Sequence, residues 1–584
     1  MTATLPSPTA PRHLVAIDVA ALRESGETLP RLGDRIASIR SFIVLVYVDG
    51  EERLGLPEPD YVISPSGDRI VRLPAGDELD DWPGVDGPVD LEAAVGHLAE
   101  QLLVPPSEIY AVFGADRELH GTLERLLVLG GKAEPEQGRW VGSVSEDAVI
   151  GALDEEGFLA GPAAAAPDIC DTGFTQAIES LRRNVTEYGF TAASLADNPL
   201  SVHDANYASV WSRDGIITGL WTLCLDDPEL IEAFRATLRL IAAHQAPAGQ
   251  IPSNVRLETM RPDYSGIGGI ASIDSVLWFV IGAVRLAFHT RDRHFAEEML
   301  EPVERAMAWL AAHDANNDGL IEIPESSDWM DIFPRSYNVL YDEVLWFQSC
   351  RDTAALLDAL GRDGSAWRAL GDRAKGEILG QFWPTGEQLM EIAGSQGGRF
   401  SVGEAYYLLS QITPFDYSWR CDVYANLLAA LAGLLDERKL DRLFSFLWGV
   451  GVNSPFPVTC LYPPITSGAD DWKDYFLVNF LNLPGHYHNG GIWPFIGGLW
   501  IRFLAATNRV ELAHRELTQL AGACRQGVDG EWEFNEWLHG TTGRPMGKAH
   551  QAWSAASYAN AYQVLHGNAE PRVFVALDPA DLSA

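Results

Sequence analysis

Apolar residues recur every three or four positions through most of the chain after about residue 170, which is the spacing of amphipathic helices. Loops rich in Gly, Pro, Asn and Asp, such as residues 314–319, separate these segments. Strand patterns are nearly absent between them. The pattern predicts about twelve helices, over residues 172–188, 213–224, 227–245, 272–290, 294–313, 339–360, 366–382, 422–436, 438–449, 488–506, 510–526 and 549–566.

The first part of the chain has a different rhythm. Short apolar runs at residues 13–18, 42–48 and 109–113 have the composition of buried strands, and residues 91–103 have the pattern of an amphipathic helix. Strands that alternate with helices are typical of α/β domains. We therefore expect a smaller α/β domain before the helical part.

About a dozen helices joined by long loops that carry aromatic residues fit an (α/α)6 toroid, in which one set of loops forms a single pocket. A helical solenoid is the alternative, but no self-similarity at a fixed period supports it. The predicted fold class is mainly α. The predicted division is a disordered N-terminus (1–12), an α/β domain (13–160), a Gly-, Pro- and Ala-rich linker (161–170), the toroid (171–570) and a tail (571–584).

The charge balance narrows the range of partners. The chain has 42 Lys and Arg against 81 Asp and Glu, a net charge of −39, which repels phosphate backbones and anionic lipid. No apolar run reaches the roughly 18 residues of a membrane span. We expect neither nucleic acid nor a membrane as a partner, and the sequence leaves a homo-oligomer open.

The cysteines and the N-terminus bear on the compartment. Six cysteines lie far apart, with neither a CxxC pair nor histidines at metal-ligand spacing, which disfavours a disulfide framework and a structural zinc. Residues 1–12 do not have the pattern of a secretory signal. We expect a cytoplasmic protein without a metal or another cofactor.

Candidate chemistry is concentrated near the C-terminus. Residues 485–494, 531–538 and 548–554 bring aromatic rings, amides and a carboxylate together in loop-like sequence. Sugar rings stack their apolar faces on Trp or Tyr, while their hydroxyls need polar partners. These segments predict a carbohydrate-active enzyme that binds a small sugar.

Cleavage of a glycosidic bond needs one protonated carboxyl group and one carboxylate. Four loop-like clusters place acidic residues beside tryptophan: residues 211–215, 325–331, 470–474 and 531–536. Most of the 81 acidic residues belong to the solvated surface, so the tryptophan context is what singles these clusters out.

Several of these segments resemble, in order, those of the alkaline/neutral invertase family. They are residues 206–214, 273–278 and 487–494, then Asn535-Glu536 and residues 551–554. Related toroidal glycosidases, including amylo-α-1,6-glucosidase-like and mannosylglycerate hydrolase-like proteins, share parts of the pattern. The resemblance implies an (α/α)6 catalytic domain and an inverting hydrolysis.

The resemblance also implies roles for particular residues. The general acid falls on Asp331, with a pKa raised by burial near Trp329 and Phe333, and the base falls on Glu536, which we expect to remain ionised. Asp328 is a rival acid. The implied substrate-binding residues are Tyr207, Trp211, Arg213, Asp214, Asp274, Trp329, Glu343, His488, Asn489, Trp493, Gln551 and Trp553.

Structural alternatives exist for some of these residues. Trp493 and Trp553 can equally be core aromatics at helix starts, and Arg213 with Asp214 can form a buried ion pair without a catalytic role. Both carboxyl candidates are nevertheless in place, which counts against an inactive carbohydrate-binding regulatory protein.

The substrate expectation is a small α-glucoside, with sucrose first. Residues 331–335 depart from the Arg pair that invertases of the family carry after the acid, which affects the fructose side. The alternatives are α-1,6-glucosidic oligosaccharides and glucosyl- or mannosylglycerate.

The α/β domain resembles haloacid-dehalogenase-type phosphatases. Asp18 stands where that family has its first motif, residues 62–67 resemble its Ser/Thr motif, and residues 105–116 resemble the strand before its magnesium-binding acids. Ala20 and Ala115 replace two expected acids, so the Mg²⁺ site loses charge. We expect a degenerate, non-catalytic domain; Mg²⁺-dependent phosphatase activity is the alternative.

Overall fold

The chain divides into two compact units, residues 1–166 and 167–584. The computed structural model describes residues 169–198, 207–266, 269–384 and 406–582. Within the first unit it describes eight strands and two single residues, Val95 and Leu98. The expected disorder of residues 1–12 lies outside the described residues.

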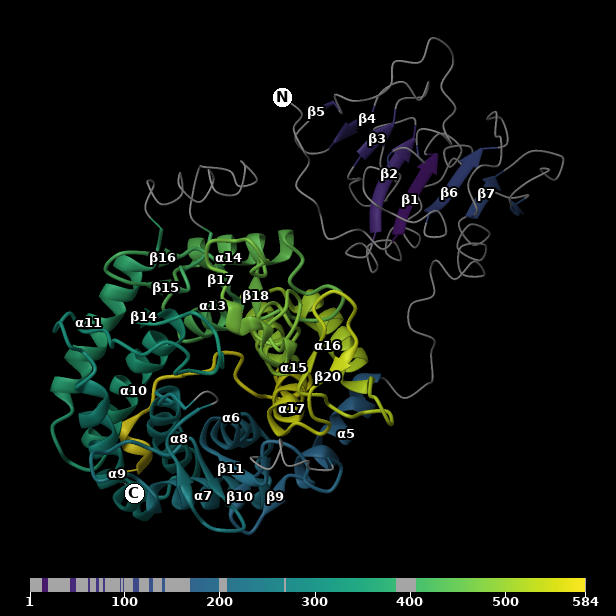
Figure 1. Cartoon of the computed structure of the whole chain (residues 1–584). Coiled ribbons are helices and arrows are strands. Elements are labelled where there is room, and N and C mark those ends of the chain that lie inside the picture. Colours follow the sequence, from purple (N-terminus) through teal and green to yellow (C-terminus); the bar gives the residue numbers. More distant parts are fainter. Residues whose placement is uncertain are drawn as a thin grey trace. The chain divides into compact units, whose positions relative to one another are not determined.

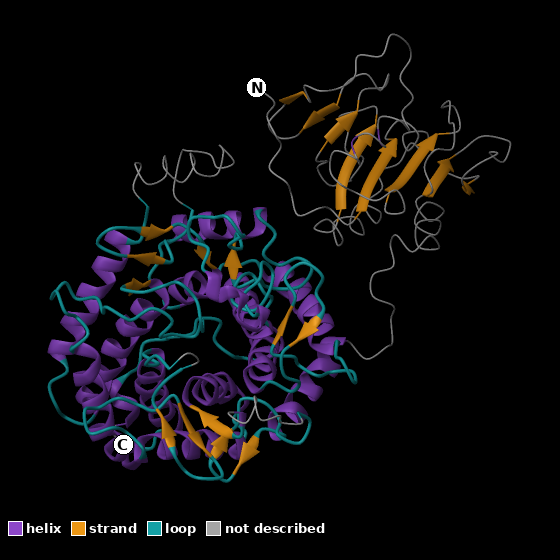
Figure 2. Cartoon of the chain, in the orientation of Figure 1, coloured by secondary structure: helices purple, strands orange, loops and turns teal. Residues whose placement is uncertain are grey.

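The strands of the first unit form one sheet, drawn as arrows in Figure 2. Its order is β5-β4-β3-β2-β1-β6-β7-β8; β4 and β5 are antiparallel additions at one edge, and the other pairings are parallel. The strands are β1 (His13–Asp18), β2 (Ile43–Val48), β3 (Tyr61–Ile63), β4 (Ile70–Arg72), β5 (Asp77–Glu78), β6 (Ile109–Gly114), β7 (Arg125–Leu129) and β8 (Arg139–Val141).

All three predicted strands of this unit are present, as β1, β2 and β6. Asp18 is the last residue of β1, and β6 is the neighbour of β1 in the sheet. The other motif residues, Ala20, Ser64 and Ala115, lie outside the described residues, as does most of the predicted helix over 91–103. The phosphatase resemblance and the loss of its activity therefore stay predictions.

In the described part of the second unit, twelve α-helices form two concentric layers (Figure 1). The inner layer is a closed ring, because each inner helix contacts the next and the last contacts the first. In order around the ring these are α6 (Ser212–Thr222), α8 (Asp274–Thr290), α10 (Leu340–Ala359), α13 (Val423–Leu431), α15 (Pro494–Ala506) and α17 (Ala552–His566).

An outer helix packs on each inner helix, and in five of the six pairs it follows that inner helix along the chain. The sixth pair joins the two ends of the unit, since the first helix packs on the last. The outer helices are α7 (Pro228–Ala243), α9 (Arg293–Ala311), α11 (Ser365–Gln381), α14 (Glu437–Gly449), α16 (Val510–Arg525) and α5 (Ile169–Arg182). The closed ring confirms the predicted (α/α)6 toroid and excludes an open solenoid.

The two layers differ in how their side chains are buried. In α10, 17 of the 20 residues are buried, because both faces meet other helices. In α9 the buried side chains follow a three-to-four spacing, from Phe295 and Met299 through Val303 to Leu310. Asp227 and Asp292 cap the outer helices α7 and α9 by accepting hydrogen bonds from backbone N–H groups.

The inner helices begin at one end of the ring, because an outer helix runs back after each of the first five and before the sixth. Extended residues precede five of them: Trp211, Val339, Asp422, Trp493 and Gln551. Short strands occupy these loops: β9 (Val185–Thr186), β10 (Gly189–Phe190), β11 (Ser209–Trp211), β12 (Asn254–Arg256), β13 (Pro262–Asp263), β14 (Asn338–Val339), β15 (Gln411–Ile412), β16 (Tyr417–Ser418), β17 (Cys421–Asp422), β18 (Leu461–Tyr462), β19 (Trp537–Leu538) and β20 (Pro545–Met546).

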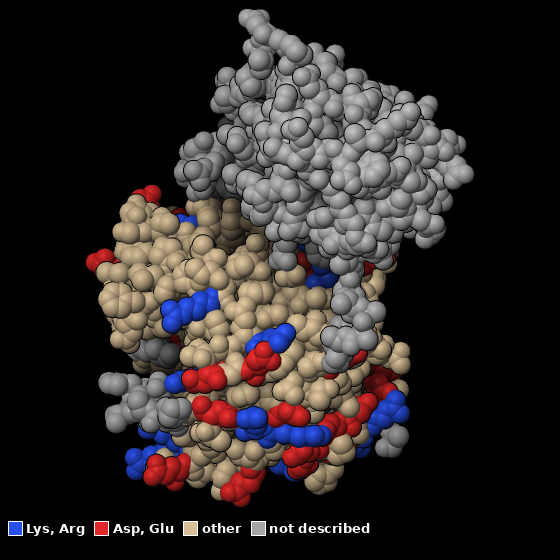
Figure 3. All heavy atoms as spheres, turned by 90° about the vertical axis from the view of Figure 1, so that its right-hand side faces the viewer, with Lys and Arg blue, Asp and Glu red and all other residues tan. Residues whose placement is uncertain are grey.

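Charged side chains of both signs lie next to one another over the lower part of the face in Figure 3. Arg182 pairs with Asp227 at 3.2 Å, and Arg183 with Asp197 at 2.9 Å. Such exposed pairs contribute little to stability. None of the described helices combines the length and the apolar character needed to cross a membrane.

The C-terminal segment crosses the other end of the ring (Figure 1). Arg502, near the end of α15, donates hydrogen bonds to the backbone oxygens of Glu570, Pro571 and Arg572 at 2.8–3.1 Å, and to Asn560 at 2.8 Å. Its side chain is buried. The Arg502 side chain therefore links residues 570–572 to the inner helices α15 and α17.

We expect Arg502→Met to lower the free energy of unfolding by about 3 kcal/mol, because buried oxygens lose their donor. Thermal unfolding of the full chain, followed by circular dichroism, measures this change. Arg291→Met is the control, since Arg291 also reaches the tail, at Asp581, but 74% of its side chain is exposed. A loss as large in the control would contradict the role given to Arg502.

Candidate active site

A small cavity lies where the loops before four inner helices meet. The loops before α6 and α10 contribute acidic and aromatic residues, and those before α15 and α17 contribute aromatic rings, a histidine and a glutamate. The lining residues are Ala192, Tyr207, Trp211, Arg213, Asp214, Trp329, Asp331, Tyr487, His488, Trp493, Glu536 and Trp553. Both predicted catalytic carboxyls and eight of the predicted binding residues thus meet in one place.

Asp331 is 9% exposed. Asn482 holds the backbone here by donating to the carbonyl oxygens of Asp331 and Ile332, at 3.3 and 3.1 Å. Among the described residues, no hydrogen-bond donor reaches the Asp331 carboxyl group. Burial raises the pKa of Asp331 to about 7; the charge of Arg213 opposes this shift and the carboxyl of Asp274 adds to it. The predicted rise is confirmed.

Glu536 is 7% exposed and has donors around it. The Tyr207 hydroxyl lies 3.1 and 3.2 Å from its two oxygens, and the backbone N–H of Lys548 donates to Oε2 at 3.2 Å. These donors favour the ionised form, but burial outweighs them and raises the pKa of Glu536 to about 7.

The expected charge state of Glu536 therefore needs correction. A pKa of about 7 leaves roughly half of the Glu536 carboxyls protonated at pH 7, whereas the sequence led us to expect an ionised group. The burial that the catalytic cavity imposes is the reason.

Asp328, the rival acid, is committed elsewhere. Its Oδ2 lies 2.7 Å from Nε of Arg335, and its Oδ1 accepts the backbone N–H of Met330 at 2.7 Å. Its side chain is buried and does not line the cavity. A carboxylate held by an arginine and a backbone N–H, away from the cavity, is not placed to meet a substrate, which favours Asp331.

Arg213 pairs with Asp274 rather than with Asp214. Its Nε lies 3.3 Å from Oδ2 of Asp274, and its Nη1 donates to the backbone oxygen of Asp328 at 3.1 Å. Asp214 instead accepts a hydrogen bond from Gln551 at 3.2 Å, and burial raises its pKa to about 6. Asp214 is therefore free of an arginine partner at the cavity wall.

Several polar atoms at the cavity have no hydrogen-bond partner among the described residues. Both ring nitrogens of His488 and the indole nitrogens of Trp329 and Trp553 are buried and unpaired. The His488 ring lies parallel to Trp493, with centroids 5.2 Å apart. Burial keeps the pKa of His488 well below its usual range, so the ring is neutral. Unpaired buried groups around a small cavity suit a ligand rich in hydroxyls.

The tryptophans serve the core and the cavity together. Trp493 and Trp553 are nearly fully buried, and their rings meet edge to face with centroids 5.9 Å apart. Both also line the cavity. The core interpretation and the binding interpretation of these two residues are therefore compatible.

Four predicted binding residues lie behind the cavity wall. Asp274 pairs with Arg213, and Gln551 donates to Asp214. Glu343 accepts the backbone N–H of Ile321 at 3.1 Å, and Asn489 bridges both backbone groups of Ile465 at 2.6 and 2.8 Å. These residues position the wall and do not reach the cavity.

Tyr487 and Ala192 line the cavity but were not among the predicted binding residues. Tyr487 has a φ of 41°, a left-handed conformation that is uncommon for this residue type. Its pKa is raised by burial first and then by the charges of Asp331 and Glu536. The position of Tyr487 directly before His488 in the sequence could have identified it as a cavity residue. Nothing in the sequence around Ala192 indicated that it lines the cavity.

Within the described ranges, no group of three or more His, Cys, Asp or Glu side chains is arranged to hold a metal ion. The charges at the cavity belong to Asp214, Asp331, Glu536 and Arg213. The arrangement can accept and release protons at two carboxyls while it binds a polyhydroxylated ring.

Comparisons of the sequence point to the glycoside hydrolases. A sequence profile of alkaline and neutral invertase matches residues 390–568, which include Glu536, His488, Trp493 and Trp553. Neutral/alkaline invertase 1, mitochondrial, of Oryza sativa subsp. japonica is 22% identical over 66% of this chain and 69% of its own length. Alkaline/neutral invertase E, chloroplastic, of Arabidopsis thaliana is 22% identical over 70% and 74%.

Solved structures are similar at a coarser level. The GH63 mannosylglycerate hydrolase from Thermus thermophilus in complex with glucose has a TM-score of 0.47 and 17% identity, over 68% of this chain and 99% of that chain. The chain resembles alkaline and neutral invertases, and the sequence matches support glycoside hydrolase activity.

We expect Arg213→Met to lower the free energy of unfolding by about 3–5 kcal/mol, since it leaves the fully buried Asp274 without its cation. Adding Asp274→Leu to the same chain should restore part of the loss. Urea unfolding measures both.

The matched control is Arg239→Met, which breaks a partly exposed pair with Glu298 and should cost under about 1 kcal/mol. If the double variant were as unstable as the sum of the two single variants, the ion pair would not be the cause.

Proposed function

We propose that the chain is an inverting glycoside hydrolase of small α-glucosides, with sucrose as the first substrate to test. The observation that carries this proposal is the pair of nearly buried carboxyls, Asp331 and Glu536, in a cavity lined by tryptophans and unpaired polar groups. The resemblance to alkaline and neutral invertases supports the same activity.

In the proposed reaction Asp331 is the general acid. Its carboxyl proton passes to the glycosidic oxygen as the bond from that oxygen to the anomeric carbon breaks, and the leaving group departs as an alcohol. The absence of donors at this carboxyl and its raised pKa favour the protonated form that the step needs.

Glu536 is the general base. It takes a proton from a water molecule whose oxygen bonds to the anomeric carbon on the face opposite the leaving group, so the product has the β configuration. The donors of Tyr207 and Lys548 support the ionised form of Glu536. One proton leaves Asp331 and one arrives at Glu536 in each turnover.

The unpaired groups give the glucosyl ring its partners. The neutral His488 can both donate to and accept from ring hydroxyls, and the indole N–H groups of Trp329 and Trp553 can donate to them. Asp214 adds an anionic acceptor at the wall. Sucrose remains the first choice because the matching profile of alkaline and neutral invertase covers His488 and Trp553.

The test is hydrolysis of sucrose by the purified full chain, followed by proton NMR from the first minutes. We expect β-glucose before mutarotation sets in, as inversion requires. Early α-glucose would contradict inversion. Without sucrose turnover the substrate claim fails, and isomaltose, glucosylglycerate and mannosylglycerate are the next substrates to assay.

Asp331→Asn and Glu536→Gln should each lower kcat by about a thousandfold, because each removes one half of the proton transfer. Glu297→Gln is a control on the exposed side of α9, where Glu297 pairs with Arg293, and should leave kcat unchanged. Near-normal kcat in either active-site variant would contradict the assigned role.

The pH dependence of kcat/KM should be bell-shaped around pH 7. Activity rises as Glu536 ionises through its pKa of about 7, and falls as Asp331 loses its proton through its own pKa of about 7. Tyr207→Phe removes a hydrogen bond that lowers the pKa of Glu536, so the acid limb should move to higher pH. A moved alkaline limb, or an unmoved acid limb, would contradict these assignments.

A further inference from the structure

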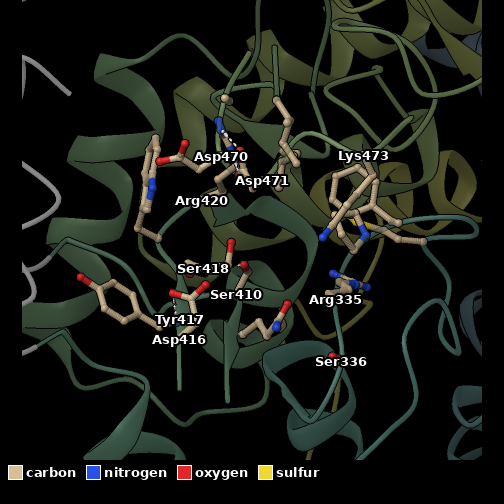
Figure 4. Close-up of a pocket in the computed structure, with 18 of the residues that line it drawn as sticks. Arg335, Ser336, Ser410, Asp416, Tyr417, Ser418, Arg420, Asp470, Asp471 and Lys473 are labelled. Atoms are coloured by element: carbon tan, nitrogen blue, oxygen red, sulfur yellow. Dashed lines mark hydrogen bonds and ion pairs between the residues drawn. The ribbon is translucent and has the colours of Figure 1, made fainter. Parts of the chain in front are cut away.

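A second hollow opens beside the catalytic cavity, over the strands before α10 and α13 (Figure 4). We call it the side pocket. β15 and β16 provide one wall, with Gln411 and Ser418, and the loop after β18 provides another, with Asp471 and Lys473. Its third wall is the loop that follows Asp331.

The side pocket and the catalytic cavity share that loop. Trp329 and Asp331 line the catalytic cavity, while Met330, Phe333 and Arg335 line the side pocket. A leaving group sits next to the residue that protonates the glycosidic oxygen. A leaving group whose glycosidic oxygen faces Asp331 can therefore extend into the side pocket.

Two buried polar atoms of the side pocket have no hydrogen-bond partner in the part of the chain that the structure describes. One is a donor, Nη2 of Arg335, whose side chain is almost fully buried, and the other is an acceptor, Oε1 of Gln411. Orphaned groups of this kind are uncommon in native proteins and carry a free-energy cost. Hydroxyl groups suit both kinds of atom, since a hydroxyl can accept from a guanidinium and can donate to an amide oxygen.

The charges of the side pocket disfavour an anion. Four acidic side chains and three basic ones line it. Arg335 already contacts the carboxylates of Asp328 and Asp422, and Arg420 forms a bidentate pair with Asp471 (Figure 4). An incoming carboxylate or phosphate would meet an excess of negative charge, and it could not donate to Gln411.

We propose that the side pocket binds the leaving group of the substrate and that this group is a neutral sugar or polyol. This inference rests on the proposed hydrolysis. Arg335 and Gln411 hold its hydroxyls, and Trp419, which also lines the side pocket, offers an aromatic surface for a sugar ring. Glycosides of acidic leaving groups are then poor substrates.

The test compares α-glucosyl fluoride, which has no sugar leaving group, with sucrose, trehalose, isomaltose and glucosylglycerate. For Gln411→Leu we expect kcat/KM for the best disaccharide, divided by that for the fluoride, to fall about three- to tenfold, as the loss of one hydrogen bond predicts. Gln176→Leu, on the outer helix α5, is the matched control and should keep the ratio of the unaltered chain.

An unchanged ratio in Gln411→Leu, or glucosylglycerate as the best of the glycosides, would overturn the inference. If even the fluoride is not hydrolysed, the proposed function fails. Binding measurements then test the proposed role of the side pocket independently of hydrolysis. Calorimetry with the same disaccharides on Asp331→Asn should show affinity that Gln411→Leu weakens about three- to tenfold. Equal affinity with and without Gln411→Leu, or no binding of any disaccharide, would overturn the inference as well.

Discussion

The ion pairs of Arg335 fix the loop that carries the proposed acid. Its guanidinium holds Asp328 in that loop and reaches Asp422, the residue that caps the inner helix α13. On the other side, Arg213 joins the starts of α6 and α8 through Asp274. Both arginines are buried, and breaking such pairs costs several kcal/mol. The shape of the catalytic cavity therefore depends on two cations shared among carboxylates.

The same arrangement sets the acid–base properties of the cavity. Among the described residues no donor reaches the Asp331 carboxyl, and its high pKa is caused first by burial, with the carboxyl of Asp274 adding to the rise. Glu536 is equally buried but has the donors of Tyr207 and Lys548. The two carboxyls thus have similar pKa values, but only Glu536 has neighbouring donors that stabilise its ionised form. This difference suits Asp331 to the acid role and Glu536 to the base role.

Periodicity was enough to predict all twelve described helices of the toroid, because helix spacing is a local property. The predicted start of 488–506 was wrong by six residues, since residues 488–493 form a turn and isolated bridges to neighbouring segments, and α15 begins at Pro494. Motif order identified most of the cavity wall. Motif order could not predict that the side chains of Glu343 and Asn489 form hydrogen bonds with backbone groups, or that Arg213 pairs with Asp274. Those partners are distant in sequence.

If the proposed roles are right, Asp331 and Glu536 lie on opposite sides of one glucosyl ring. A crystal structure of the full chain with glucose bound can show this. We expect glucose in the catalytic cavity, carboxyls about 6.5–9.5 Å apart and a water between Glu536 and the anomeric carbon. Carboxyls about 5–5.5 Å apart, with Glu536 directly on the anomeric carbon, would contradict it and indicate a retaining enzyme.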